Sequence, residues 1–354
     1  MQQTKSCFAR RVLWASARVG MLLCSTLALV PITRAQTYSV TDLGTLGGTL
    51  SWALGIDSSG RIVGYADTAN GVSHAFLWSE GQMQDLGALG DSDSTAYAVN
   101  ASERVVGSSD NVNGSTHAFL WTQPGGMQAL NGAEFATFVS AINASGQMAG
   151  ALATGRDNPW RAAFWSNTGT IHQLPTLGGY SSEGLSINDA GQVVGFSQIG
   201  DRVNNHAFLW SKTGGIEDLG TLGGSTSSAH AINSSGEVVG WASLPQEFSS
   251  RAFLWNRTKG MRNLGTLGGF SSTADAINKS GQVVGWSYLA DGYTSHAFLW
   301  TASGGMQDLN NLIPANSGWV LSNANAINRS GQIVGSGFVN GSYYQHAFLL
   351  TPTR

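Results

Sequence analysis

Four short phrases of apolar and polar residues recur along the chain in a fixed order. Two of them, Q-V-V-G and H-A-F-L-W, are rich in β-branched and aromatic residues and are too short for helices. The other two, A-I-N-x-S-G and x-D-L, complete each copy of the repeat. No segment carries helical periodicity over the roughly ten residues that a helix needs, so the pattern predicts four β-strands per copy.

Each phrase occurs seven times, and the glycines that end Q-V-V-G mark the copies most clearly: Gly64, Gly107, Gly150, Gly195, Gly240, Gly285 and Gly335. Successive glycines are 43, 43, 45, 45, 45 and 50 residues apart. A period near 45 residues with four strands is typical of a β-propeller blade. The sequence therefore predicts an all-β chain, a seven-bladed β-propeller of about 45-residue four-stranded repeats.

The turns between the predicted strands differ in how uniform they are. N-x-S-G, as at Asn143–Gly146, and the Gly-Gly pair, as at Gly214–Gly215, are short turns that change little between copies. In a four-strand meander these two turns share one face of the blade. The irregular connections, G-T-L-G-G and the loop from Q-V-V-G to H-A-F, then fall on the other face. Because binding residues concentrate in variable loops on a rigid scaffold, we expect any ligand on that second face.

The two ends of the repeat array complement each other. The first x-D-L strand, Tyr38–Leu43, precedes the first complete copy, whereas the last copy ends at His346–Leu350 without such a strand. Pairing them would complete the seventh blade and remove exposed strand edges. The alternative, an open β-solenoid, should carry atypical terminal caps. We therefore predict a ring closed by the N-terminal strand.

The H-A-F core stands at His74, His117, His206, His296 and His346. With these motifs the sequence resembles the bacterial HAF-repeat extracellular proteins over nearly all of the chain after residue 35. The resemblance implies an exported repeat protein and no established biochemical activity. Ala162 and Arg251 replace the histidine in two copies, which argues against a role that needs a histidine in every copy.

The first residues have the features of an export signal. Four basic residues and no acidic one precede an apolar stretch, Val19–Val30, that is too short to span a bilayer comfortably. Pro31 and the small-x-small sequence Thr33–Ala35 follow. We predict a signal peptide at 1–35, a propeller domain at 36–354, and a secreted or periplasmic protein. The alternatives are a cytosolic helix and a retained membrane anchor.

Composition narrows the classes of partner. Cys7 and Cys24 lie within the predicted signal, so the domain should contain no disulfide or thiolate metal site. Loss of five of the 18 basic residues and no acidic one changes the net charge from −3 to −8, which argues against nucleic-acid binding. Only 11% of residues are charged, so uncharged polar side chains must form most of the polar surface. We expect no nucleic acid, no membrane anchor and a monomer.

Two sets of positions could bind a ligand. The irregular connections contain aromatic residues that do not recur at the same position in every copy. Such side chains offer a sugar or protein a large rigid contact. These residues are Trp52, Trp160, Tyr180, Phe248, Phe270, Tyr293, Trp319, Tyr343 and Tyr344. We expect a minority of them to be exposed and at least three to line one concave region.

The second set lies two residues before the isoleucine or valine of A-I-N: Leu54, Tyr97, Ser140, Leu185, His230, Asp275 and Asn325. These side chains would lie near a central channel if that strand is innermost, which the sequence leaves open. From both sets we select as candidate ligand-binding residues Trp52, Tyr97, Trp160, Tyr180, His230, Phe270, Asp275, Tyr293 and Trp319.

The recurrent histidine and the acidic residues do not indicate a metal site. Histidines of neighbouring blades would be too far apart to share a zinc ion, whose bonds to nitrogen are about 2.0–2.1 Å, so we expect them to hold neighbouring loops. Asp91 and Asp93 form only a fragment of a calcium loop, and a polar turn is the better interpretation.

Catalytic motifs are also missing from the sequence. A glycosidase needs two facing carboxylates, whereas Glu183, Asp201, Glu247 and Asp275 are isolated along the chain. There is no G-x-S-x-G, P-loop or H-E-x-x-H motif. We therefore expect no catalytic residue, no cofactor and no metal, and predict an exported binding or surface-interaction module with a glycan or protein ligand. The alternative is a carbohydrate-active enzyme on the same scaffold.

Overall fold

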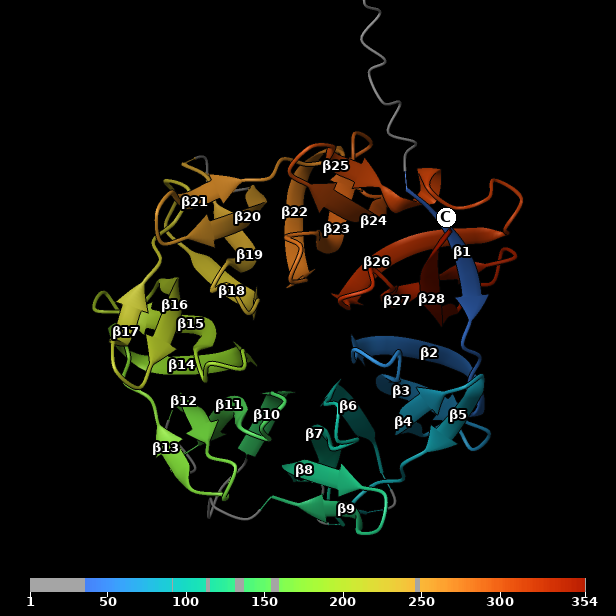
Figure 1. Ribbon diagram of the computed structural model, residues 1–354, viewed down its shortest axis with the longest axis horizontal. Coiled ribbons are helices and arrows are strands. Elements are labelled where there is room, and N and C mark those ends of the chain that lie inside the picture. The colour runs from blue at the N-terminus through green and yellow to red at the C-terminus, as the bar shows by residue number, and fades with distance from the viewer. Residues whose placement is uncertain are drawn as a thin grey trace, which may run out of the picture. The chain divides into compact units, whose positions relative to one another are not determined.

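The computed structural model describes residues 36–90, 92–112, 115–130, 137–153, 159–245 and 249–353. Within these ranges the chain forms 28 strands and one short 3₁₀ helix, η1 (Leu309–Asn311). The strands make seven four-stranded antiparallel sheets arranged as blades in a ring (Figure 1). The predicted seven-bladed β-propeller is thereby confirmed. The predicted signal peptide, Asp91, Glu247 and Phe248 lie outside the described residues, within which no helix is long and apolar enough to cross a membrane.

The order of strands within a blade follows the order of the phrases. The innermost strands carry A-I-N: β2 (Gly47–Ile56), β6 (Ser94–Val99), β10 (Thr137–Ile142), β14 (Gly178–Ile187), β18 (Ser227–Ile232), β22 (Gly268–Ile277) and β26 (Trp319–Ile327). The second strands carry Q-V-V-G: β3 (Ile62–Thr68), β7 (Val105–Asp110), β11 (Met148–Ala153), β15 (Val193–Ile199), β19 (Val238–Ser243), β23 (Val283–Leu289) and β27 (Ile333–Val339).

The third strands carry H-A-F: β4 (Ser73–Ser79), β8 (Thr116–Thr122), β12 (Trp160–Trp165), β16 (Asn205–Ser211), β20 (Ser250–Asn256), β24 (Ser295–Thr301) and β28 (Gln345–Thr353). The outer strands are β5 (Gln82–Asp85), β9 (Gly126–Ala129), β13 (Ile171–Gln173), β17 (Gly215–Asp218), β21 (Gly260–Asn263), β25 (Gly305–Asp308) and β1 (Thr37–Asp42). Blades 1 to 6 are contiguous from β2 to β25, and blade 7 consists of β26, β27, β28 and β1.

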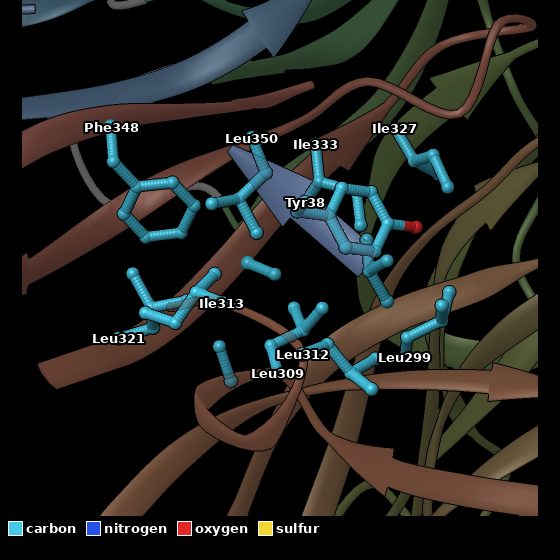
Figure 2. Packing of buried hydrophobic residues seen from close by; sticks show 13 residues of the cluster. Tyr38, Leu299, Leu309, Leu312, Ile313, Leu321, Ile327, Ile333, Phe348 and Leu350 are labelled. Carbon is cyan, nitrogen blue, oxygen red and sulfur yellow. The ribbon is translucent and has the colours of Figure 1, made fainter. Parts of the chain in front are cut away.

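The N-terminal strand closes the ring as predicted. β1 pairs with β28 in antiparallel register, from Thr37 opposite Thr353 to Asp42 opposite Phe348. Tyr38 is 1% exposed and inserts among Leu309, Leu312 and Leu350 in the core between blades 6 and 7 (Figure 2). The expected end of the last strand at Leu350 was wrong, because β28 continues to Thr353 and its residues from Phe348 onwards pair with β1.

Each innermost strand contains a β-bulge at the same place, where two of its residues oppose one on the second strand. The bulge explains the glycine of Q-V-V-G. A Cβ on Gly64 would clash with the carbonyl oxygen of Trp52, and one on Gly195 would clash with that of Glu183. The same clash recurs in the other five blades. Glycine is therefore needed for close backbone approach.

The asparagine of A-I-N links each blade to the next. In six copies its Nδ2 atom donates to the carbonyl oxygen of the equivalent residue in the following blade, at 3.0–3.2 Å. These residues are Asn100, Asn143, Asn188, Asn233, Asn278 and Asn328. Copy 1 has Asp57 here, and a carboxylate cannot donate. Arg61 instead binds the Asp57 carboxylate at 2.6 Å and donates to Ala101 O at 2.9 Å. These seven links form a continuous hydrogen-bonded hoop around the ring.

The histidine of H-A-F pairs with the aspartate of x-D-L on the outer strand. The Nδ1–carboxylate distance is 2.7–3.0 Å in four blades: His74–Asp85, His206–Asp218, His296–Asp308 and His346–Asp42. The last pair joins the two ends of the chain. The histidine is thus structural, as expected, but its partner is a neighbouring strand. Although burial raises the pKa of Asp308, hydrogen bonds from His296 and Asn310 outweigh it and hold that pKa below its ordinary value.

Candidate binding face

The antiparallel meander places all irregular connections on one side of the ring. This side, here called the variable face, holds the loops between second and third strands, such as 200–204, 290–294 and 340–344, and the connections between blades. The N-x-S-G and Gly-Gly turns lie on the opposite side. The predicted sorting of the loops is therefore confirmed.

The variable residues of the A-I-N strand are the bulge residues. Each of the seven positions lies at the register shift of an innermost strand, beside the axis of the ring: Leu54, Tyr97, Ser140, Leu185, His230, Asp275 and Asn325. Two of them hold the ring together, because Ser140 Oγ donates to Gly184 O at 2.7 Å and Asn325 Nδ2 donates to Ala53 O at 2.9 Å. His230 differs, since its Nδ1 lies 3.0 Å from the carboxylate of Asp275 in the next blade.

A second set of variable positions lies next to the bulge residues, on the side towards the variable face. It consists of cross-strand pairs between the residue two before the bulge and the residue after the Q-V-V-G glycine: Trp52–Tyr65, Thr95–Ser108, Phe138–Ala151, Glu183–Phe196, Ser228–Trp241, Thr273–Trp286 and Asn323–Ser336. The second members of these pairs were not among the residues predicted from the sequence. The available signal was a position that is aromatic in four copies and Ser or Ala in three.

One cavity on this face has a volume of about 490 Å³. Phe138 and Ala151 of blade 3, Trp160 of β12, and Glu183 of blade 4 line it. Phe138 also contacts Tyr97, with ring centroids 5.0 Å apart. Burial raises the pKa of the Glu183 carboxyl. This cavity therefore combines aromatic walls with one half-buried acid.

A smaller cavity of about 300 Å³ lies between blades 4 and 5. Its walls include Phe196 and Trp241 from the second strands, and His230 lies at its inner end beside the axis. Burial raises the pKa of Asp275, and the hydrogen bond from His230 offsets only part of this effect. Two candidate residues, His230 and Asp275, are thus in direct contact. A further cavity of about 450 Å³, which Phe164, Trp210 and Lys212 help to line, opens at the uniform turns.

The candidate aromatic residues are more exposed than expected. Six of the eight described positions are exposed: Trp160, Tyr180, Phe270, Tyr293, Tyr343 and Tyr344. The expectation that only a minority would be exposed was wrong, because these side chains lie in loops or at strand ends of the variable face, where neighbouring segments leave them uncovered. All six lie at the variable face. Of the eight, however, only Trp160 lines one of the cavities described above, so the predicted concave cluster of three is not found there.

Several aromatic candidates instead pack in local pairs. Phe270 stacks on Tyr288 with centroids 4.6 Å apart, and the guanidinium of Arg202 lies 4.2 Å from the ring of Tyr180. Trp52 stacks on its cross-strand partner Tyr65 at 6.1 Å. Trp319 packs edge-on against Phe348 at 5.9 Å and belongs to the core of blade 7. Trp52 and Trp319 are therefore partly structural.

The acidic candidates do not assemble into a metal site. In the described ranges, no group of three or more His, Cys, Asp or Glu side chains is close enough to hold an ion. Asp93 Oδ1 accepts a hydrogen bond from Ser73 N at 3.0 Å, as a polar turn residue would. Asp201 accepts from the backbone of Val203 and Asn204 within its own loop.

Comparison with known proteins supports the fold and does not define a family. No protein-family model matches the chain, and no curated protein matches it. The propeller domain of the Trilobed protease from Pyrococcus furiosus, which has an open velcro topology, is similar with a TM-score of 0.52 and 12% identity, over 73% of this chain and 83% of that one.

Two further solved structures are less similar. TolB from Acinetobacter baumannii has a TM-score of 0.46 and 10% identity over 88% of this chain, which spans 65% of that protein. A gluconolactonase from Xanthomonas campestris has a TM-score of 0.43 and 12% identity, over 90% of this chain and 95% of that one. At these identities the likeness shows the fold alone: the chain is a β-propeller.

Proposed function

We propose that this protein is an exported, non-catalytic β-propeller of the HAF-repeat type that binds a glycan or protein ligand on its variable face. One observation carries the proposal. The positions that differ between copies gather on the inner strands and loops of one face, where they form two aromatic-walled cavities and expose six aromatic side chains.

The division between constant and variable residues supports this proposal. The constant residues have structural functions that any propeller of this type would need: the asparagine hoop, the glycine beside the bulge, and the histidine–aspartate pairs. Among the variable positions only some, such as Ser140 and Asn325, have a structural function of this kind. Exposed aromatic side chains are typical anchors of binding sites.

One observation favours the alternative, a carbohydrate-active enzyme. A carboxyl group with a raised pKa can act as a general acid, and Glu183 lines the cavity of about 490 Å³ with Phe138 and Trp160. Glycoside hydrolysis needs a second carboxylate opposite the first. Among the described residues that line this cavity, Glu183 is the only acid, so we favour binding without turnover.

The test uses the purified domain on a glycan array and in a pull-down from culture supernatant. A variable-face variant, Tyr180→Ala with Phe270→Ala and Tyr293→Ala, should weaken binding of whatever ligand is found by about tenfold or more. The matched control, Gln173→Ala with Lys212→Ala and Lys259→Ala near the uniform turns, should bind as the wild type does. Equal loss in both variants would contradict a binding face, and release of sugar products that Glu183→Gln abolishes would establish the enzyme instead.

A further inference from the structure

We infer that the cavity between blades 4 and 5 is a subsite for one neutral pyranose ring, with Trp241 and Phe196 as its walls and His230 as its polar anchor. This inference rests on the proposed binding function and names the ligand class for one part of the face.

The cavity has the size and lining that a single sugar ring requires. Its volume of about 300 Å³ lies at the lower end of the roughly 300–1,000 Å³ that is usual for small-molecule sites. Phe196 and Trp241 offer flat apolar surfaces for the C–H face of a pyranose. The polar residues Asn205, Thr226 and Ser228 also line the cavity. A lining of two aromatic residues and several uncharged polar ones suits a ring that is apolar on its faces and hydroxylated at its edge.

Asp275 sets the hydrogen-bonding state of His230. While Asp275 is ionised, its carboxylate can only accept hydrogen bonds, so in the neutral imidazole the proton then lies on Nδ1, 3.0 Å from Asp275 Oδ1. Nε2 is then an acceptor, and within the described part of the chain no group donates to it. Because His230 lines the cavity, this acceptor is available to a donor from a ligand, such as a sugar hydroxyl. Asp275 is a positioning residue for this contact.

The fold itself does not require this pair. Blades 3 and 7 use Ser140 and Asn325 at the bulge, and each bonds directly to the backbone of the next blade. In blade 5 the bulge residue instead bonds to a desolvated carboxylate, which is a costly arrangement for linking two blades. Blade 5 is also the only copy that combines a histidine at the bulge with an aromatic residue after the glycine. A ligand contact explains this combination.

The charges at the cavity favour a neutral ligand over an anion. No described lysine or arginine is among the residues that line it, and His230 already faces a carboxylate. A phosphate or carboxylate ligand would therefore lack a cationic partner. A small cation could lie against Trp241, and the experiment includes it as a competing outcome.

The experiment is an NMR titration of the full domain with the methyl glycosides of glucose, galactose, mannose and fucose, and separately with tetramethylammonium. At least one glycoside should shift the imidazole Hε1 signal of His230, which is assigned by its loss in His230→Gln. Trp241→Ala and His230→Gln should weaken that glycoside by about tenfold or more. Trp241→Phe should retain most of the affinity. Trp286→Ala, the equivalent position in blade 6, is the matched control and should bind normally.

The role of Asp275 has its own measurement. In the wild type, ¹⁵N spectra of the imidazole should show the Nδ1–H form of His230, and Asp275→Ala should yield a mixture of both neutral forms with weaker glycoside binding. A glycoside that binds equally well to Trp241→Ala, or no shift of His230 with any glycoside, would overturn the subsite. Tighter binding of tetramethylammonium than of every glycoside would also overturn it. The proposed function would survive these results if the array or pull-down ligand still depended on Tyr180, Phe270 and Tyr293, and would fail if no ligand did.

Discussion

The asparagine of the A-I-N phrase forms hydrogen bonds through both the oxygen and the nitrogen of its side-chain amide. In Asn188 the Oδ1 atom accepts hydrogen bonds from the N–H groups of Ala190 and Gln192, which shapes the hairpin turn. Its Nδ2 atom donates to Asn233 O in the next blade. The turn function was evident from the sequence, whereas the link between blades was not, because spacing within a repeat says nothing about contacts between repeats.

Replacing this amide by an acid should break the hoop at one point. We expect Asn188→Asp to lower the free energy of unfolding by about 1–3 kcal/mol, since the carbonyl of Asn233 loses its donor and faces a carboxylate. The double variant Asn188→Asp with Gln192→Arg copies the Asp57–Arg61 arrangement of blade 1 and should recover much of the loss. Urea titrations measure all three proteins. A double variant no more stable than the single one would contradict the assigned function of Arg61.

The glycine beside the bulge gives a second prediction. Gly195→Ala should cost about 3 kcal/mol, the upper end of the usual range for overpacking, because the added Cβ meets the rigid backbone carbonyl of Glu183. Gly200→Ala is the matched control, since a Cβ there has nothing within 4 Å. Thermal melting compares the two variants. Equal melting temperatures would show that the bulge yields easily and that its carbonyl does not require glycine.

Asp275 gives a prediction about pH. Burial raises its folded pKa above the ordinary value, so its contribution to stability is most favourable at low pH and declines as pH rises from the unfolded pKa towards the folded one. Asp275→Asn removes this dependence and can still accept the bond from His230. We therefore expect the variant to be as stable as the wild type or more stable at pH 7, with the difference disappearing below about pH 4. A variant that is less stable at pH 7 would mean that the ionised pair stabilises the ring.

At the scale of the element, one buried side chain, Tyr38, anchors the outer strand of blade 7 to the core. Tyr38 is the most deeply buried residue of β1, and its ring packs against Leu309, Leu312 and Leu350 (Figure 2). Its hydroxyl has no hydrogen-bond partner among the described residues, and burial raises its pKa to about 12. The packing of the ring, and not its polar atom, therefore holds β1 in place.

The anchor and the strand can be tested separately. Tyr38→Ala should cost about 3–5 kcal/mol, as for other large aromatic residues in cores, whereas Tyr38→Phe should leave stability unchanged or higher. Deleting Thr37–Asp42 should cost more still, because it also removes the pairing with β28. Trimming the last residues is not a neutral control, since Thr351–Thr353 pair with β1. A deletion that melts at the temperature of the wild type would disprove closure by β1.

At the scale of the whole molecule, closure leaves the outer strands of the seven blades as sheet edges, and most of them are short. The outer strands of blades 1 to 6 have three or four residues each, and short edges discourage pairing with another chain. We expect a monomer at all accessible concentrations by analytical ultracentrifugation, and self-association of the Thr37–Asp42 deletion through the exposed edge of β28. Dimers of the wild type that the Tyr180, Phe270 and Tyr293 substitutions abolish would instead assign the variable face to self-association.

Much of the fold could be predicted from the sequence, because the chain consists of repeated copies. Seven in-phase copies determine the number of blades, the strands and the closure at β1, since each is a periodic property or a mismatch at the ends. The bulge, the hoop and the cross-strand pairs were not accessible. They depend on which strand is innermost and on contacts such as His230–Asp275 between copies, and these follow only from three-dimensional register. The exposure of Tyr180 and Phe270 was also misjudged, because the sequence does not show which segments pack over the ends of the strands.

The pairing of β1 with β28 also determines when folding can finish. Blades 1 to 6 are each built from one continuous stretch of chain, so they can form in order of synthesis. Blade 7 must wait, because its outer strand is at the start of the domain and its third strand is at the end. Long separation costs little in stability, about 0.6 kcal/mol for each doubling of loop length, but non-local contacts of this kind slow folding. The ring therefore closes only once β28 has been synthesised: a product truncated before Gln345 would leave β1 unpaired and the Tyr38 side chain open to proteolysis.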